Sequence, residues 1–211
     1  MARWEGNTRS RLERAALDLF TEQGYDRTTV AQIAQRANLT ERSFYRWFTD
    51  KREALFGGAE ELETHLVSAI GTVPVGTGAL QTLLAAFATA PQVFRPREFL
   101  QERAAVIEAN PPLQEREQIK LVSLSKALAV ALENRGFDRQ TAQLATDVGL
   151  MVVRLASERW ATDERTDFAQ ALEASTADLL TITAGVSRSR PAEPPARDQP
   201  QDQPRDQDAG A

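Results

Sequence analysis

Apolar and polar positions repeat with a helical period through most of this 211-residue chain, from about residue 8 to residue 186. Apolar side chains recur at three- and four-residue steps, which places them on one face of an α-helix. The sequence shows no sustained alternation with period two, and no Asn-Gly or Asp-Gly pair of the kind that closes β-hairpins. The pattern therefore predicts an all-α protein.

Glycine, proline and capping residues divide this pattern into helices. The first predicted helix runs from about residue 8 to residue 23 and stops at Gly24. Asp50 and Glu53 have the spacing of a capping box, which predicts a fourth helix over 51–70. The Gly- and Pro-containing segment 71–78 separates it from five further predicted helices, near 79–90, 96–109, 112–134, 138–161 and 166–186.

Residues 28–48 predict two short helices joined by a tight turn. Thr29 and Gln32 can form a capping box at the start of the first of these helices. Asn38 tolerates the left-handed backbone that a helix C-terminus requires, and Thr40 can cap the second helix. This arrangement is typical of a helix-turn-helix, whose second helix enters a DNA groove.

The second helix of this motif has one apolar and one polar side. Leu39 can pack on Phe44, and Phe44 and Phe48 lie four residues apart, so both face the interior. The other side carries polar and aromatic residues that suit contacts with phosphates and groove edges better than contact with water alone: Glu41, Arg42, Ser43, Tyr45, Arg46 and Trp47. A generic helical domain that binds no DNA is the alternative.

These residues resemble the DNA-binding domain of Tet-repressor (TetR) family regulators. The resemblance covers about the first third of the chain and rests on Ala16, Phe20, Gly24, Thr28 to Val30, Ile33, Ala34, Ala37, Phe44 to Phe48, Asp50 and Lys51. It implies that Tyr45 and Lys51 contact phosphate. The complete set of expected DNA-contacting residues is Thr28, Thr29, Thr40, Arg42, Ser43, Tyr45, Arg46, Trp47 and Lys51.

The chain departs from the family pattern at two places. Asn38 stands where the family usually has glycine, and the segment 51–55 is one residue longer before its leucine than the commonest version. Asn38 should preserve the turn at slight strain.

Charge and composition narrow the classes of function. The net charge is −5, but residues 1–57 hold ten Lys or Arg against eight Asp or Glu, so they carry +2 and the remainder carries −7. A basic first domain on an acidic body orients the molecule toward phosphate. With no Cys and only His65, the sequence predicts no disulfide, no His/Cys metal site and no nucleophile centre of the Ser-His-Asp or Cys-His type in the first domain. The acidic residues do not pair with a base and an electrophile, so we expect no enzyme centre and no cofactor. His65 is interpreted as a surface residue, with a pH switch as the alternative.

No apolar run in the sequence approaches the length of a membrane span, so we expect a cytoplasmic protein.

The last two predicted helices favour a homodimer. The helix over 138–161 is apolar nearly all round, and one neighbouring surface cannot cover it. The resemblance implies that these two helices pair with the same two from a second subunit. The expected interface residues are Val148, Val152, Leu155, Phe168, Leu172, Thr176, Leu179 and Thr183. A self-contained core with weak pairing is the alternative.

The segment between about residues 79 and 161 is where the resemblance implies an effector cavity. Arg103 lies among apolar positions and could hold an anionic group, or it could reach water or pair with Glu102 or Glu108. A weaker resemblance, over Asn110 to Leu113 with Arg116, Glu117 and Lys120, suggests an acyl-coenzyme-A-like ligand. The candidate lining, which overlaps with core positions, is Phe99, Arg103, Ile107, Leu121, Leu124, Ser125, Leu128 and Val152.

Together these features predict a DNA-binding domain over 1–57, a ligand-binding and dimerisation domain over 58–186, and a disordered Pro-rich tail over 187–211. The expected function is that of a dimeric repressor that binds a palindromic operator and is released by a small ligand. Two alternatives remain: an activator of the same family, and a helical small-molecule-binding protein that no longer reads DNA.

Overall fold

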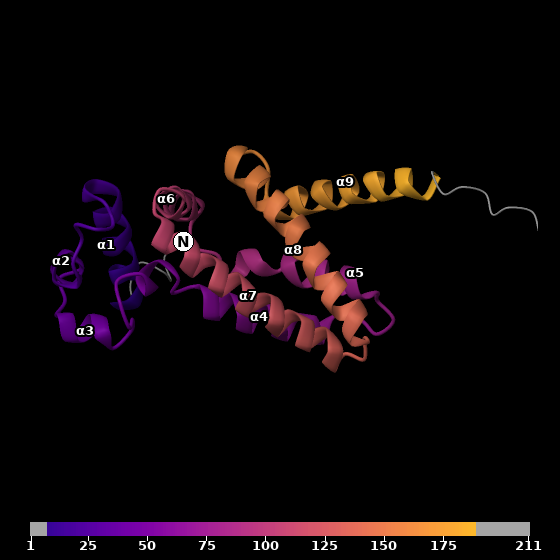
Figure 1. The fold of residues 1–211 in the computed structure, drawn as a ribbon, viewed down its shortest axis with the longest axis horizontal. Helices are drawn as coiled ribbons and strands as arrows, with labels where there is room; N and C mark the ends of the chain where they lie inside the picture. Colours follow the sequence, from indigo (N-terminus) through magenta and orange to yellow (C-terminus); the bar gives the residue numbers. More distant parts are fainter. Residues whose placement is uncertain (1–7, 189–211) are drawn as a thin grey trace, which may run out of the picture.

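A computed structural model describes the backbone of residues 8–188 and the side chains of residues 8–184, and this part of the chain is all-α (Figure 1). None of its helices is long and apolar enough to cross a membrane. The predicted tail lies outside the described residues, apart from positions 187 and 188, which end the last helix.

The first part of the chain forms a small head at one end of the molecule. It contains α1 (Thr8–Gln23), α2 (Val30–Arg36), α3 (Glu41–Tyr45) and the 3-10 helix η1 (Glu53–Leu55). The rest forms the body, with α4 (Ala59–Thr72), α5 (Ala79–Ala88), the 3-10 helix η2 (Ala90–Gln92), α6 (Arg97–Glu108), α7 (Pro111–Asn134), α8 (Arg139–Thr162) and α9 (Phe168–Arg188). The predicted helices are thus present, with one exception in the fourth.

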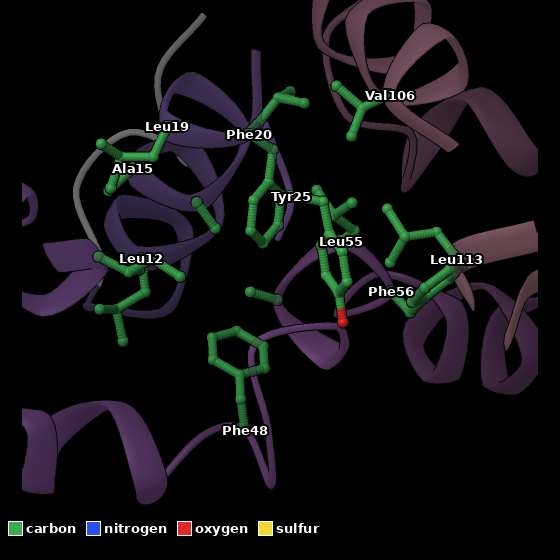
Figure 2. Close-up of a cluster of buried hydrophobic side chains, with 14 of the residues drawn as sticks. Leu12, Ala15, Leu19, Phe20, Tyr25, Phe48, Leu55, Phe56, Val106 and Leu113 are labelled. Atoms are coloured by element: carbon green, nitrogen blue, oxygen red, sulfur yellow. The ribbon is translucent and has the colours of Figure 1, made fainter. Parts of the chain in front are cut away.

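The core of the head also includes residues from the body. Leu12, Phe20 and Phe48 are buried together with Val106 from α6 and Leu113 from α7 (Figure 2). Helix α6 packs directly on α1. The predicted division at residue 57 therefore separates residues that share one apolar core.

A second apolar core holds the body together. It joins α4, α5, α7, α8 and the first half of α9 through residues such as Leu66, Leu83, Leu132 and Phe168. Gly149 of α8 lets Leu83 of α5 approach closely, because a Cβ at residue 149 would lie 2.3 Å from Leu83 Cδ2. This contact explains a glycine inside a long helix, where it is otherwise destabilising.

The predicted continuous fourth helix over 51–70 is wrong. Asp50 does cap the segment, since its Oδ1 accepts hydrogen bonds from the backbone N–H groups of Arg52 (2.8 Å) and Glu53 (3.3 Å). The Glu53 carboxylate, however, forms ion pairs with Arg116 and Lys120 of α7. Only η1 forms there, and α4 starts after residues 56–58.

Charged side chains close the junction around this interruption. Arg95, just before α6, pairs with the buried Glu13 of α1 (3.0 Å) and with Glu61 of α4 (3.1 Å). Arg14 of α1 pairs with Glu102 of α6 at 2.6 Å. Burial by itself would raise the pKa of Glu53, but Arg116 and Lys120 outweigh this effect and hold that pKa below its usual value.

The opposite side of α6 contacts the turn between α8 and α9. The Arg97 guanidinium donates to the carbonyls of Asp163 (3.0 Å) and Thr166 (2.8 Å) and lies 4.6 Å from the ring centroid of Trp160. Gln101 donates to the Ala161 carbonyl at 2.6 Å. Helix α6 therefore touches both the head and the base of α9.

Two adjacent glycines at the junction, Gly57 and Gly58, differ in how closely the surrounding side chains approach them. A Cβ on Gly57 would lie 2.2 Å from Glu13 Oε1, whereas a Cβ on Gly58 would meet only Arg95, at 3.7 Å. We expect Gly57→Ala to lower the free energy of unfolding by about 1–3 kcal/mol, because it displaces a buried, paired carboxylate. Gly58→Ala should stay within about 1 kcal/mol of the wild type, since residue 58 already has an ordinary helical backbone.

Urea titrations followed by circular dichroism would compare these two variants. Equal stability of both would contradict the tight packing of Glu13 against the backbone of residue 57.

Candidate nucleic-acid interface

The local signals of the helix-turn-helix are confirmed in atomic detail. Thr29 Oγ1 accepts from the Gln32 backbone N–H (3.2 Å), and Gln32 Oε1 accepts from the Thr29 N–H (2.9 Å), which completes the predicted capping box. Thr40 caps α3 by accepting from the Ser43 N–H at 3.2 Å. Asn38 has φ 53°, as predicted for the residue that ends α2.

Helix α3 is held against the head by two phenylalanines. Phe44 and Phe48 are buried, with ring centroids 5.3 Å apart. The regular helix ends at Tyr45, and the next turn continues it through hydrogen bonds from Trp47 and Phe48 to the Phe44 carbonyl. This anchoring fixes which side of α3 faces outward.

The outward side carries the polar and aromatic residues expected from the sequence. Tyr45 is 56% exposed and Trp47 43% exposed, while Arg42 and Arg46 are also exposed. The Arg46 guanidinium carbon lies 5.7 Å from the Trp47 ring centroid. Large aromatic groups on a solvent-facing surface indicate an interaction site.

The cations of the head differ in how they are engaged. Among the side chains of residues 8–184, those of Arg42 and Arg46 make no hydrogen bond or ion pair, although the Arg46 guanidinium lies over the Trp47 ring. The other head cations are bound to carboxylates or carbonyls of the protein itself: Arg9, Arg11, Arg14, Arg27, Arg36, Lys51 and Arg52. Arg42 and Arg46 are therefore the head cations best placed to meet a phosphate or a base edge.

Two residues predicted to contact DNA form hydrogen bonds within the head in this structure. Thr28 is only 1% exposed, and its hydroxyl donates to the Gly24 carbonyl at 2.9 Å, so it stabilises the connection between α1 and α2. The Lys51 ammonium donates to backbone carbonyls of the same connection. The sequence pattern places both residues near the motif, but it does not show that neighbouring carbonyls already occupy their polar atoms.

The predicted ligand residues are divided between the two apolar cores and the surface of the described chain. Phe99 and Ile107 belong to the head core, Leu128 and Val152 belong to the body core, and Leu121 is exposed. Leu124 and Ser125 are half-buried on α7. Two surface hollows, of about 450 and 430 Å³, lie at the helix-turn-helix turn and beside the turn between α7 and α8, and neither is lined by any of these residues.

Arg103 connects the head and the body. Its guanidinium donates to the Leu55 carbonyl (2.7 Å) and to Glu117 (3.2 Å), and it lies 4.9 Å from the Phe56 ring centroid. The expected partners Glu102 and Glu108 are not the ones used. Burial lowers the pKa of Arg103, an effect that Glu117 opposes. Arg103 thus binds a carbonyl and a carboxylate of the protein itself at the junction.

His65 is half-buried and lies 2.8 Å from the Thr89 hydroxyl oxygen. That hydroxyl donates to the Ala86 carbonyl, so the His65 ring nitrogen is the donor of this bond. The expectation of a solvated surface histidine is wrong, because the side chain links α4 to the end of α5.

The expected dimer-interface residues fall into two groups. Val152, Phe168 and Leu172 are buried in the chain's own body core and cannot meet a partner. The remaining five retain exposure: Val148, Leu155, Thr176, Leu179 and Thr183. The predicted interface residues of α9 recur at three- and four-residue steps. This spacing does not show which side of the helix faces α8 and which side is left free.

The most exposed apolar residues of α8 and α9 were not among those chosen from the sequence. Leu180 is 61% and Ile182 68% exposed, and Leu144 and Met151 of α8 are exposed as well. In the sequence, these residues are further apolar positions on the same two helices, next to the face that was predicted to form the interface. In Figure 1 the outer part of α9 extends away from the rest of the chain.

Comparisons with known proteins agree with this architecture. Residues 13–57 match the family model of bacterial regulatory proteins, tetR family. The chain is 38% identical over 80 residues to the HTH-type transcriptional regulator TcmR of Streptomyces glaucescens, and the match spans 38% of this chain and 35% of TcmR.

Solved structures extend the likeness to the fold of the body. A transcriptional regulator from Aquifex aeolicus matches with a TM-score of 0.54 at 20% identity, covering 83% of this chain and 99% of that one. SmeT of Stenotrophomonas maltophilia, in its triclosan complex, matches with a TM-score of 0.54 at 19% identity, covering 81% and 90%. The helix-turn-helix is therefore similar in sequence to the tetR family model, and the described helices are similar in fold to those of solved transcriptional regulators.

Proposed function

We propose that this protein is a DNA-binding transcriptional regulator of the TetR family, a dimeric repressor that binds a palindromic operator through the outer side of α3 and is released by a small molecule. The observation that carries the proposal is the exposed surface of α3, where the side chains of Arg42 and Arg46 have no hydrogen-bond or ion-pair partner among those of residues 8–184 and lie beside Tyr45 and Trp47. A bacterial repressor works where its operator lies, in the cytoplasm.

In the proposed complex the residues of α3 divide by task. Arg42, Ser43, Arg46 and Trp47 approach base edges, because they lie on the outer side of a helix that enters the major groove. Tyr45, with the exposed residues Thr29 and Thr40 at the helix starts, contacts phosphates. The buried Thr28 takes no part.

The proposed dimer forms through α8 and α9. Leu180 and Ile182 lie on the outer half of α9, where the side chains of residues 8–184 leave them 61% and 68% exposed, and an exposed apolar helix of this kind is typical of an interaction surface. A second copy supplies the same apolar helices, and a two-fold interface buries both sets. Two heads on one axis then read two half-sites, which is why we infer a palindromic operator.

Release requires a ligand that prefers a conformation in which the two heads are wrongly spaced. The interruption at residues 56–58 means that α4 is not a rigid lever continuous with the head. Helix α6 contacts α1 on one side and the α8–α9 turn on the other, through Arg97 and Gln101. We infer that α6 carries the coupling between dimer and head.

The proposed effector is a small molecule. SmeT has been solved in complex with triclosan, which makes a small-molecule effector reasonable for a regulator of the same fold. The expected anionic, acyl-coenzyme-A-like ligand is not part of the proposal, because Arg103 binds a carbonyl and a carboxylate of the protein itself at the junction. Repression is proposed over activation because SmeT is described as the repressor of an efflux pump.

Arg42→Ala tests base reading. A duplex selected by the wild-type protein from a random DNA pool serves as the operator, and a scrambled duplex of the same composition serves as the reference. We expect Arg42→Ala to weaken binding to the selected duplex by about 1–3 kcal/mol and to reduce its advantage over the scrambled one. The matched control is Arg139→Ala, which removes an exposed arginine of the body. Equal effects of the two substitutions in fluorescence-anisotropy titrations would refute the assigned interface.

Charges on α9 test the dimer. Leu180→Asp with Ile182→Asp should produce monomers in sedimentation velocity at micromolar concentration, because a dimer would have to bury unpaired carboxylates. The fold of the protomer should survive, since both residues are exposed within one chain. Val75→Asp is the control, because Val75 is 99% exposed in the connection between α4 and α5. A charged α9 that still sediments as a dimer would contradict the proposed interface.

A further inference from the structure

The side chain of Glu41 is an unpaired carboxylate on the outer surface of the head. Glu41 is the first residue of α3, directly after the cap Thr40, and it is exposed. Among the side chains of residues 8–184, that of Glu41 makes no hydrogen bond or ion pair. Asp26, in the connection between α1 and α2, is also without an ion pair there. The other carboxylates of the described head are bound by cations of the protein: Glu13, Asp18, Glu22, Asp50 and Glu53.

The sequence of α3 explains why Glu41 stays unpaired. Residues three and four positions apart face each other on a helix, and at these positions Glu41 has Phe44 and Tyr45. Arg42 is the next residue, so it points about 100° away around the helix axis. Arg46 lies five residues further along the helix. Neither cation of α3 is therefore at a position that favours pairing with the carboxylate.

An open space lies beside Glu41, between α2 and α3. It is the surface hollow of about 450 Å³ at the helix-turn-helix turn, which Glu41 and Thr40 line from α3 and Ala31 and Gln35 line from α2. The small side chain of Ala31 leaves room on this side. The N-terminal residues of a recognition helix are those that approach base edges in the major groove. In the proposed complex, a base edge therefore has access to the Glu41 carboxylate.

A carboxylate in the major groove is selective because it offers only hydrogen-bond acceptors. Guanine presents the acceptors N7 and O6, thymine presents O4, and adenine presents N7 beside its N6 amine. Cytosine presents its N4 amine without an acceptor beside it. A carboxylate that leaves water for the groove is costly unless it gains a hydrogen bond, and the DNA phosphates add repulsion. Glu41 therefore favours cytosine and opposes guanine.

We propose that Glu41 is a specificity-determining residue of the recognition surface. Its carboxylate accepts a hydrogen bond from the N4 amine of a cytosine at one position of each half-site and rejects guanine there. This inference rests on the proposed reading of an operator by α3, and it adds a residue that was not among the predicted DNA contacts. A purely structural role would have Glu41 stabilise α3 alone, because an acidic residue in the first turn interacts favourably with the helix dipole.

Selection from a random DNA pool by the wild type and by three variants separates these roles. Glu41→Gln keeps the size of the side chain but places a donor beside its acceptor, the pattern that fits adenine. Glu41→Ala removes the hydrogen bond. Glu60→Gln is the matched control, because Glu60 is also an exposed acid in the first turn of a helix, α4 of the body. Circular dichroism well below the melting temperature confirms that each variant is folded.

Base reading by Glu41 predicts a change at one symmetric position of the selected motif. Glu41→Gln should replace cytosine by adenine there, and Glu41→Ala should select no base there, while the other positions stay unchanged. In anisotropy titrations, the wild type should bind the selected duplex about tenfold more tightly than a duplex with guanine in place of that cytosine. Glu41→Ala should abolish this difference. Glu60→Gln should select the wild-type motif.

Two results would overturn the inference and leave operator reading in place. One is the same motif from the wild type, Glu41→Gln and Glu41→Ala, with a change in melting temperature alone, which is the behaviour of a residue that only stabilises α3. The other is a variant that binds every duplex more tightly with unchanged discrimination, which is the behaviour of an acid that only repels DNA. A wild-type protein that selects no sequence would instead remove the proposed function, and this inference with it. Should Glu41→Ala fail to fold, Glu41→Gln alone decides, because only base reading predicts a new preference for it.

Discussion

The packing of α6 against the head is the constraint on which the rest of the structure depends. Glu13 is buried inside α1, and a buried carboxylate is strongly unfavourable unless it is paired. Its partner Arg95 comes from the segment that leads into α6, so the body must approach the head there. Apolar residues of α6 and α7 then complete the head core. A head separated from α6 would leave both a charge and an apolar surface uncovered.

This arrangement affects how motion can pass between the two parts. Residues 56–58 interrupt the direct connection through α4, and the charged groups around them come from α1, η1, α4, α6 and α7. Ion pairs at such a boundary have directional geometry, so a small rotation of α6 changes several of them together. An all-apolar boundary would tolerate sliding, whereas this one favours a few discrete positions.

The features predicted correctly from the sequence are those that depend on residues close to one another along the chain. The caps at Thr29 and Thr40, the left-handed backbone at Asn38, the inward Phe44 and Phe48 and most helix limits are local features, and their signals lie within four residues. The break in the fourth helix was missed because Arg116 and Lys120, about 63 to 67 residues away in sequence, draw the Glu53 side chain away from its expected cap.

The wrong predictions at the candidate sites also result from long-range packing, which the sequence pattern does not reveal. Helical periodicity shows that Val152 and Leu172 share faces with other apolar residues, but not whether those faces meet the same chain or a second one. Arg103 and Lys51 carry charge that suits an anion, and in this structure both also bind backbone carbonyls distant in sequence. A pattern along the chain identifies the chemical type of a side chain, and only the folded arrangement shows what it is bound to.

The uncovered outer half of α9 has a consequence for how the regulator responds to its own abundance. If a second copy covers Leu180 and Ile182, the species that binds DNA forms in proportion to the square of the protomer concentration whenever protomers are in excess. Operator occupancy then rises more steeply than linearly with expression. Small changes in the synthesis or degradation of the protein would then cause larger changes in operator occupancy. When the protein is diluted, operator occupancy would fall by a larger factor than the protein concentration.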